Sequence, residues 1–369
     1  MGQIKVLHIM SRADFGGIST LIYNYYRELQ ASSVIFHVLA METSYRQQYE
    51  KIFTQMGMEV FFMPEQIVAR LAYFSKLIHQ QKYDIIHAHV ELTSAIYLSV
   101  AMLGGVKARI AHTHLSIENK GLKDAFLKGL INFVATHRVG CSQTAIVARF
   151  GKRYLQKSTV IHNAVDPSIY AFDPKVRTNY RQALGIADRY VVGFVGRLTA
   201  LKNLPYLLDV FKALHDTMEP AVLIVVGDGE LREQMESQVT KLGLSQHVLF
   251  LGNRLDVSEL LMAMDVLLLP SLSEGFGLVL VEAQATGLKC IASLDRVPKE
   301  TSLLENYSYY ESIDQPPAIW AALILSKCIQ YERKNMEVEI GLKQYDVRQE
   351  AVKLIAFYEQ VLQNKRRYG

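Results

Sequence analysis

The sequence lacks paired cysteines and long apolar runs. Its three cysteines, Cys141, Cys290 and Cys328, lie far apart and form no Cys-x-x-Cys motif. This usage is typical of a reducing compartment and excludes a disulfide framework or a cysteine-based zinc site. No apolar run approaches the roughly 20 residues that span a bilayer, and the N-terminus has no secretory signal pattern. We therefore expect a cytoplasmic protein that would meet a membrane only from the side.

The chain also lacks a strong charge bias. It has 40 Lys and Arg against 36 Asp and Glu, a formal net charge of +4, which gives no general case for a nucleic-acid partner. Half of the residues are hydrophobic and 21% are charged, which excludes a disordered protein. A length of 369 residues exceeds one typical domain and favours two.

Short runs rich in Val and Ile alternate with stretches of helical period along the whole chain. This alternation is typical of parallel sheets that are covered by helices on both faces. The strands expected in the first half are Ile4–Met10, Val34–Ala40, Glu59–Met63, Asp84–Ala88, Ala108–His112, Arg138–Cys141 and Thr159–Ile161. Those expected in the second half are Tyr190–Val195, Ala221–Val226, Val248–Leu251, Val266–Leu269 and Lys289–Ala292.

The boundary between the halves falls near residue 164. A proline-containing linker with one short helix follows, and a periodic amphipathic helix over 348–363 ends the chain. We predict an α/β protein of two doubly wound, Rossmann-like domains facing a central cleft. One consists of residues 1–164 with the C-terminal helix, 348–369, and the other of residues 165–347. In such sheets ligands lie at the carboxyl ends of the strands.

The segment from Ser271 to Gly287 carries the strongest signal. An apolar strand ends at Pro270, a turn holding Glu274, Phe276 and Gly277 follows, and a helix begins near Leu278. Glycines let the backbone approach a ligand, and a helix start offers free N–H groups to a phosphate. Glu282 lies one turn into an apolar helix, where a carboxylate needs a hydrogen-bonding partner such as a pair of ribose hydroxyls. An arginine partner would be the purely structural alternative.

Two cations and three glycine-containing turns add to this pattern. Arg197 and Lys202 flank a loop that follows a strand and Gly196, where they could neutralise a diphosphate. Gly227-Asp-Gly229 and Gly252-Asn253 follow the next two strands. In the first half, Gly16-Gly17 opens a helix after the first strand, and His87, His89, His112 and His114 end two neighbouring strands. Four histidines could suggest a metal, but zinc usually has a carboxylate or cysteine ligand as well, so we expect none.

Together these motifs resemble those of the retaining glycosyltransferases of family 4, which have the GT-B fold. Glu274 and Glu282, separated by seven residues around Gly-Phe-Gly, form the most specific part of the match. The resemblance implies that Glu274 holds the donor sugar and Glu282 the ribose, and that Phe276, Gly277 and Leu278 lie against sugar and diphosphate. It assigns Arg197 and Lys202 to the diphosphate, and Gly16, Gly17, Gly196 and Asn253 to the donor-binding loops. His114, with His112 as the alternative, would touch the transferred sugar.

The resemblance also implies the reaction. A sugar would move from a UDP-sugar, with GDP- and ADP-sugars as alternatives, to a hydroxyl of a growing glycan in exopolysaccharide or capsule synthesis. The acceptor could be linked to polyprenyl diphosphate. No Asp-x-Asp motif for a diphosphate-bound metal is present, so we expect neither metal nor cofactor. An epimerase of the same architecture, or a non-catalytic subunit that binds nucleotide sugars, is the alternative function.

A basic amphipathic stretch lies between Glu118 and Lys157. Its apolar residues recur at near-helical spacing: Leu122, Phe126, Leu127, Leu130, Ile131 and Phe133. Its cations are Lys120, Lys123, Lys128, Arg138, Arg149, Lys152, Arg153 and Lys157. Such a surface could contact an anionic membrane. The alternative is that the apolar residues pack on the sheet and the cations are solvated.

Overall fold

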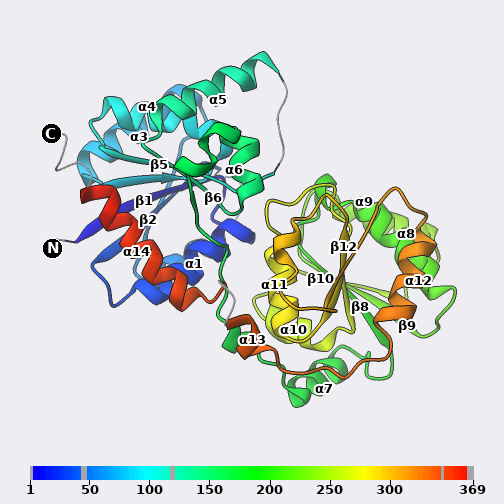
Figure 1. Ribbon diagram of the computed structural model, residues 1–369. Helices are drawn as coiled ribbons and strands as arrows, with labels where there is room; N and C mark the ends of the chain where they lie inside the picture. The colour runs from blue at the N-terminus through cyan, green and yellow to red at the C-terminus, as the bar shows by residue number, and fades with distance from the viewer. Residues whose placement is uncertain (1–2, 43–47, 117–120, 342–344, 364–369) are drawn as a thin grey trace. The chain divides into compact units, whose positions relative to one another are not determined.

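The computed structural model describes residues 3–42, 48–116, 121–341 and 345–363. The chain forms two compact units, the first from Met1–Ala164 with Val347–Gly369 and the second from Val165–Asp346. Each unit contains one parallel sheet with helices on its two faces (Figure 1). Among the described residues, no helix is long and apolar enough to cross a membrane. Glu118 and Lys120 of the basic stretch, and residues 364–369 of the expected C-terminal helix, lie outside the described residues.

The first unit is built on a seven-stranded sheet in the order β3-β2-β1-β4-β5-β6-β7. Every neighbouring pair of strands is parallel. The strands are β1 (Ile4–Met10), β2 (Val34–Ala40), β3 (Glu59–Phe62), β4 (Ile85–Ala88), β5 (Ala108–Thr113), β6 (His137–Gly140) and β7 (Thr159–Val160). The helices are α1 (Gly17–Leu29), α2 (Gln48–Gln55), α3 (Ile67–Gln81), α4 (Ser94–Leu103), α5 (Leu122–Val134), α6 (Gln143–Phe150) and α14 (Val347–Gln363).

Alternation along the strands separates two apolar cores in this unit. Val6 packs into a core with residues of α1, α2 and α14, and its neighbour Leu7 packs into the core on the other face with α3 and α4. Successive strand side chains point to opposite faces, so one strand serves both cores. The last helix, α14, lies against α1 (Figure 1). The C-terminal segment thus completes the unit in which the chain begins.

The second unit has a six-stranded parallel sheet in the order β10-β9-β8-β11-β12-β13. Its strands are β8 (Tyr190–Val195), β9 (Ala221–Val226), β10 (Val248–Gly252), β11 (Val266–Leu269), β12 (Lys289–Ser293) and β13 (Ser308–Glu311). Its α-helices are α7 (Pro174–Ala183), α8 (Leu204–His215), α9 (Arg232–Lys241), α10 (Val257–Ala263), α11 (Leu278–Ala285), α12 (Pro317–Lys327) and α13 (Glu337–Gly341). Single-turn 3₁₀ segments include Pro167–Tyr170 and Ala200–Lys202.

The strand order reverses once in each sheet. In the first unit the reversal lies between β1 and β4, and in the second between β8 and β11. The loops at such a reversal diverge to opposite faces of the sheet and leave room for a ligand at the carboxyl ends of the strands. The segments that follow β1, β4, β8 and β11 are therefore the places to search for a site.

Candidate functional site

Two loops of the second unit meet at its strand reversal. The loop after β8 runs from Gly196 into the 3₁₀ turn Ala200–Lys202, and the loop after β11 begins at Pro270. The amide of Leu272 donates a hydrogen bond of 2.8 Å to the carbonyl of Leu201 and joins the two loops. This contact brings together Lys202 and Glu274, which lie 72 residues apart in the sequence.

Lys202 and Glu274 form an ion pair across these loops. The Nζ atom of Lys202 lies 2.5 Å from Oε1 of Glu274, and the hydroxyl of Ser271 donates to the same oxygen at 2.6 Å. The amide of Glu274 donates at 2.9 Å to the carbonyl of Arg296 and fixes the turn. The Glu274 side chain is largely buried, with 11% of its surface exposed. The carboxylate is thus held by two side chains, Lys202 and Ser271, on a turn that is fixed by its backbone.

Arg197 lies on the same edge and is exposed. Its loop is bonded to the turn after β9, because the amide of Leu198 donates at 2.9 Å to the carbonyl of Asp228. A Cβ atom on Gly227 would come within 2.1 Å of the Gly196 carbonyl oxygen, and one on Gly229 within 2.4 Å of the Leu198 carbonyl oxygen. Both glycines are therefore required for close packing against the loop that carries Arg197.

Gly196 and Asn253 belong to the same set of turns. The amide of Gly196 donates to the carbonyl of Val226 at 3.0 Å, and the amide of Gly227 donates to that of Gly252 at 2.8 Å. Asn253 follows Gly252 and is partly exposed. Three successive strand-end turns are thereby joined by backbone hydrogen bonds. Their rigidity positions backbone and side chains along one edge of the sheet.

The start of α11 lies in the loop after β11. Gly277 has a left-handed backbone, φ +83°, which glycine adopts without strain, and Leu278 is the first helical residue. The first intrahelical bond runs from the Leu280 amide to the Gly277 carbonyl at 2.9 Å. The amides before it have no acceptor within the helix and carry its positive dipole end. Phe276 is buried, and its ring stacks on that of Tyr345 with 5.2 Å between the ring centroids. This contact anchors the turn.

Glu282 is buried in the middle of α11. Burial raises the pKa of its carboxyl to about 7, and a hydrogen bond from Tyr170 opposes this rise. No arginine pairs with Glu282 among the described residues, so the structural alternative of an ion pair is wrong. Tyr170 belongs to the 3₁₀ turn Pro167–Tyr170, in the linker. No sequence pattern identified it as a partner.

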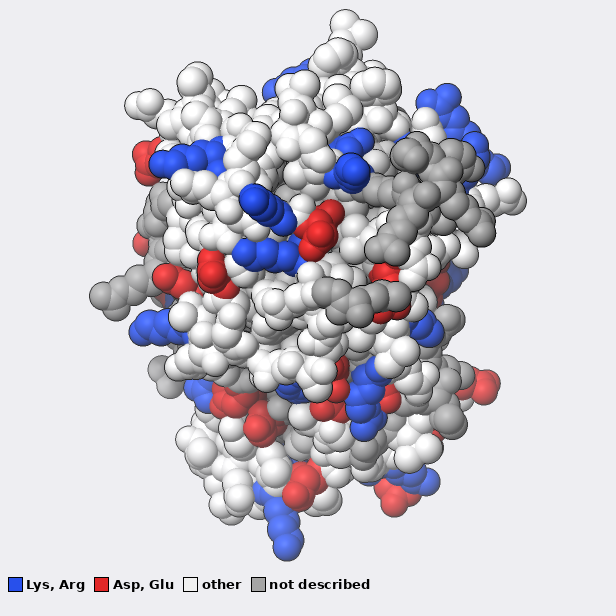
Figure 2. Space-filling view, turned by 90° about the vertical axis from the view of Figure 1, so that its left-hand side faces the viewer, with Lys and Arg blue, Asp and Glu red and all other residues white. Residues whose placement is uncertain are grey.

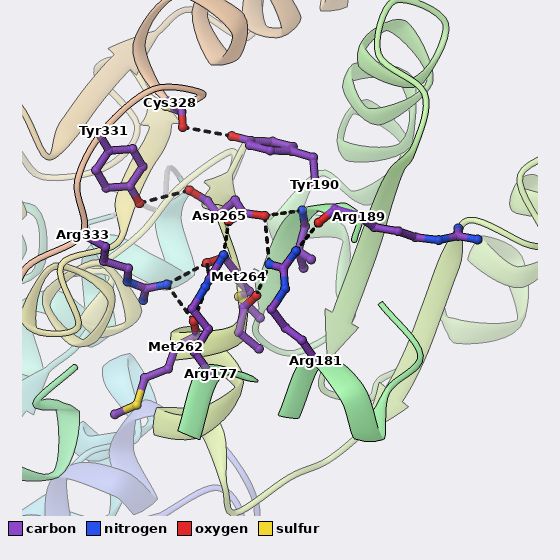
Figure 3. Close-up of polar contacts among 12 residues, drawn as sticks. Arg177, Arg181, Arg189, Tyr190, Met262, Met264, Asp265, Cys328, Tyr331 and Arg333 are labelled. Carbon is purple, nitrogen blue, oxygen red and sulfur yellow. Dashed lines mark hydrogen bonds and ion pairs between the residues drawn. The ribbon is translucent and has the colours of Figure 1, made fainter. Parts of the chain in front are cut away.

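A second group of charged side chains in this unit lies elsewhere. Asp265 accepts hydrogen bonds from Arg177 at 2.5 Å and Arg181 at 3.1 Å, and Arg333 donates to the carbonyls of Met262 and Met264 (Figure 3). Asp265 precedes β11 and also accepts from the Val191 amide at the start of β8. The group therefore lies at the amino ends of the strands. It connects α7 and the end of α10 to the sheet and is structural.

Gly16 and Gly17 begin α1 of the first unit, after β1. A Cβ atom on either glycine would meet no heavy atom within 4 Å. Packing therefore does not require glycine at these positions. The open space beside both residues leaves their backbone accessible, as a loop that approaches a ligand needs.

His114 follows β5 directly and is partly buried. Its amide donates to Oε1 of Glu91 at 2.7 Å, and its Nε2 lies 2.8 Å from Nδ1 of His89. The alternative, His112, is almost completely buried within β5. Of the two, His114 is the one with surface available to a ligand. The sequence predicted that all four histidines end two neighbouring strands, and of these His87, His89 and His112 are buried.

The basic stretch has a mixed character in the structure. Leu122, Phe126 and Phe133 of α5 expose 94%, 69% and 75% of their surface, whereas Ile131 is buried. Arg149 is buried and paired with Glu91, and Lys128 donates to the Ala148 carbonyl at 3.1 Å. Lys123, Lys152, Arg153 and Lys157 are exposed. Neither sequence alternative holds completely, because some apolar residues pack inward and others face solvent.

Two family models match the chain, one in each unit. Glycosyltransferase Family 4 matches residues 15–169, and Glycosyl transferases group 1 matches residues 176–305. The protein is a glycosyltransferase. More specifically, the chain belongs to family 4 and has the GT-B fold of two Rossmann-like domains. This membership confirms the fold class and the family that the motifs predicted.

The relatives include bacterial glycosyltransferases. EpsF of Bacillus subtilis (strain 168), named as a glycosyltransferase without a stated substrate, is 29% identical over 96% of each chain. The Escherichia coli UDP-Gal:alpha-D-GlcNAc-diphosphoundecaprenol alpha-1,3-galactosyltransferase is 26% identical over 79% of each chain.

Solved structures share the fold. Anabaena HepE in complex with UDP-glucose is 21% identical, with a TM-score of 0.77 over 96% of this chain and 100% of that chain. The lipopolysaccharide outer core galactosyltransferase WaaB is 17% identical, with a TM-score of 0.62 over 95% of this chain and 99% of that chain.

Proposed function

We propose that the protein transfers a sugar from a UDP-sugar to a hydroxyl group of a growing glycan, with retention at the anomeric carbon. The observation that carries the proposal is the grouping of Arg197, Lys202 and the start of α11 on the loops at one strand reversal. Two relatives support the choice of nucleotide: the Escherichia coli galactosyltransferase is named for UDP-Gal, and HepE is described with UDP-glucose.

The diphosphate would lie against this cationic edge. Its charge grows as it leaves, so fixed positive groups stabilise the transition state more than the bound substrate. The guanidinium of Arg197, the ammonium of Lys202 and the free amides before Leu280 would supply this stabilisation without a metal ion. In this proposal the protein needs no cofactor, and Gly196 and Asn253 shape the neighbouring backbone.

The two glutamates would hold the two ends of the donor. Glu274, fixed by Lys202 and Ser271, would accept hydrogen bonds from hydroxyls of the sugar. Glu282 would accept hydrogen bonds from the ribose hydroxyls. These bonds would offset part of the cost of burying its carboxylate away from water. A hexose or N-acetylhexosamine donor fits either arrangement.

Transfer would occur on the face of the sugar from which the diphosphate departs. The acceptor oxygen forms a bond to the anomeric carbon while the bond from that carbon to the phosphate oxygen breaks. The departing phosphate oxygen takes the proton of the acceptor hydroxyl, so no enzyme nucleophile is required. His114 would contact the transferred sugar, and catalysis would consist of positioning and charge stabilisation.

A lipid-linked acceptor would place the reaction at a membrane. The Escherichia coli relative is named for an acceptor on diphosphoundecaprenol. The exposed Leu122, Phe126 and Phe133 recur on one side of α5, because their positions differ by 4 and 11 residues, close to whole helical turns. With Lys123 and the cations of residues 152–157, this surface would contact an anionic leaflet from the side.

Hydrolysis of the donor by the purified chain tests the proposal. In the absence of an acceptor, we expect slow release of UDP from a UDP-sugar, with the sugar appearing first as the anomer present in the donor. Release of the opposite anomer would contradict retention. Conversion to an epimeric UDP-sugar would favour the epimerase, and binding without any turnover would favour the non-catalytic subunit; the comparisons support neither alternative.

A further inference from the structure

Five histidines form a connected group in the first unit, at and just beyond the carboxyl ends of β1, β4 and β5. Nδ1 of His8 lies 2.9 Å from Nε2 of His89, whose Nδ1 lies 2.8 Å from Nε2 of His114. Nε2 of His87 lies 3.1 Å from Nδ1 of His112. The rings come from three adjacent strands because β4 lies between β1 and β5 in the sheet.

Three of these rings lie close enough together to bind one ion. His89, His112 and His114 each offer a ring nitrogen, and the three nitrogens lie within 4.8 Å of one another. Nε2 of His112 is buried and has no hydrogen-bond partner within the described part of the chain. A buried polar atom without a partner typically costs about 1–3 kcal/mol. A cation at this point would satisfy that nitrogen.

We propose that His89, His112 and His114 bind a divalent transition-metal ion of the zinc class, with water in the fourth position. Three imidazoles and a water molecule form a known tetrahedral zinc arrangement, and imidazole selects zinc, cobalt, nickel or copper over magnesium. The site goes beyond the transfer reaction proposed above. That reaction assigns the charge of the diphosphate to Arg197 and Lys202, in the other unit.

Further histidines form hydrogen bonds to the ring nitrogens of the proposed ligands that do not face the ion. The second ring nitrogen of His89 bonds to His8, and that of His112 bonds to His87. His87 in turn bonds to the hydroxyl of Tyr358 in α14 at 2.8 Å. Metal-bound histidines almost always have such a partner on the other nitrogen, which fixes the tautomer and the ring orientation.

The environment also suits neutral, metal-binding imidazoles. Burial lowers the pKa of His89 and His112 well below the ordinary value, which favours the neutral form of both rings. The carboxylate of Glu91 accepts hydrogen bonds from the His114 amide and the Thr113 hydroxyl, which fixes the backbone that carries His114. Arg149 pairs with the same carboxylate.

A second group, His8, His87 and His89, has the same spacing but is fully buried. We favour the group with His114 because this ring is partly exposed and gives an ion a path from solvent. Zinc–nitrogen bonds of 2.0–2.1 Å in a tetrahedron separate the ligand nitrogens by about 3.3 Å. The 2.8 Å between His89 Nδ1 and His114 Nε2 must therefore open slightly. The proton between these atoms moves to the other nitrogen of the ring that carries it, so both imidazoles stay neutral.

Calorimetric titration of the untagged, EDTA-dialysed full chain with zinc chloride tests the proposal. We expect one zinc ion per chain, no competition by magnesium, and a visible tetrahedral spectrum when cobalt replaces zinc. His112→Asn and His114→Asn should each weaken zinc binding by more than tenfold. His79→Asn, which alters an exposed histidine on α3, should bind zinc as the wild type does.

His114→Asn provides the decisive variant, since a partly exposed side chain can be replaced with little effect on the core. Thermal unfolding without metal shows whether each variant is folded. Absence of zinc binding by the folded wild type would overturn the proposal. Equal affinity of wild type and folded His114→Asn, or an octahedral cobalt spectrum unchanged by the substitution, would overturn it as well.

Discussion

The ammonium of Lys202 lies 2.5 Å from a carboxylate oxygen of Glu274, and this pair joins the loops after β8 and β11. The lysine is therefore already neutralised in the empty protein. A diphosphate that binds there competes with Glu274 for the same cation. The pair thus links recognition of the sugar to recognition of the phosphates.

Replacing Glu274 by Gln should strengthen binding of UDP and weaken turnover. The amide keeps an acceptor for Ser271 but releases the charge of Lys202 to the nucleotide. We expect UDP affinity to rise severalfold and kcat to fall by about 10²–10³, the range for loss of one preorganised group. Calorimetry and steady-state kinetics measure the two effects. A fall in affinity with unchanged kcat would show that Glu274 does not contact the sugar.

Arg197→Ala and Lys202→Ala should each lower kcat more than they raise KM. The charge on the diphosphate increases toward the transition state, so a lost cation is felt most there. For each variant we expect a decrease in kcat of about 10²-fold or more. Arg189→Ala, at the opposite end of β8, is the matched control and should retain activity.

The same assignment predicts the effect of chelation. EDTA should not abolish turnover, because Arg197 and Lys202 stabilise the leaving diphosphate. Loss of an ion from the histidine site would alter only the sugar contact of His114 and lower the melting temperature. A loss confined to KM in either variant, or abolition of turnover by EDTA with rescue by manganese, would contradict the role given to the two cations.

Glu282→Gln should stabilise the protein above pH 7 and weaken nucleotide binding. Burial raises the pKa of Glu282 to about 7 from 4.5, so the folded state holds this proton more tightly than the unfolded state. Its contribution to stability is complete below pH 4.5 and is lost as the pH rises to about 7. At pH 8 the ionised form costs roughly 3 kcal/mol of folding free energy as an upper value. The amide oxygen can still accept from Tyr170.

Urea unfolding at several pH values measures this effect. The stability advantage of Glu282→Gln should be small at pH 5 and grow up to about pH 7, the raised pKa of the carboxyl. A pH-independent difference would show that the carboxyl does not titrate in this range. Wild-type UDP affinity in the variant would place the ribose elsewhere.

Binding to anionic vesicles should depend on the exposed side of α5. Phe126→Ser with Phe133→Ser should reduce co-sedimentation, as should Lys123→Glu with Lys152→Glu, since each cation contributes roughly 1 kcal/mol at an anionic surface. High salt should release the protein. The formal net charge is only +4, and acidic and basic side chains are interspersed on the face drawn in Figure 2. We therefore assign the binding to the exposed side of α5 and not to the overall charge. Equal recovery with neutral vesicles, or none with either lipid, would contradict it.

The sequence predicted the strands that are buried on both faces. Ile4–Met10, Val34–Ala40 and Ala221–Val226 have the predicted bounds, because short, mostly apolar runs rich in Val, Ile and Leu are typical of strands that are buried on both faces. Ser308–Glu311 was missed, since its Ser-Tyr-Tyr-Glu sequence lies partly buried at the edge of the sheet. In this short, half-polar segment the spacing of apolar residues does not predict a strand.

The candidate site was predicted as motifs but not as contacts. The pairing of Lys202 with Glu274 depends on β8 lying beside β11, and the approach of His8 to His89 depends on β1 lying beside β4. Strand order is a property of the whole sheet, which local spacing does not encode. Tyr170 reaches Glu282 from a linker with no motif of its own, so no local pattern could have named it.

Calorimetric titration with UDP-, GDP- and ADP-sugars tests the central claim most directly. A ligand that binds the native state also raises its apparent stability, so thermal unfolding in the same solutions gives a second readout. We predict that UDP-sugars bind most tightly, and that Glu282→Ala and Arg197→Ala both weaken this binding. Absence of binding by all three donor classes, or equal UDP affinity in wild type and both variants, would contradict a nucleotide-sugar site on the loops after β8 and β11.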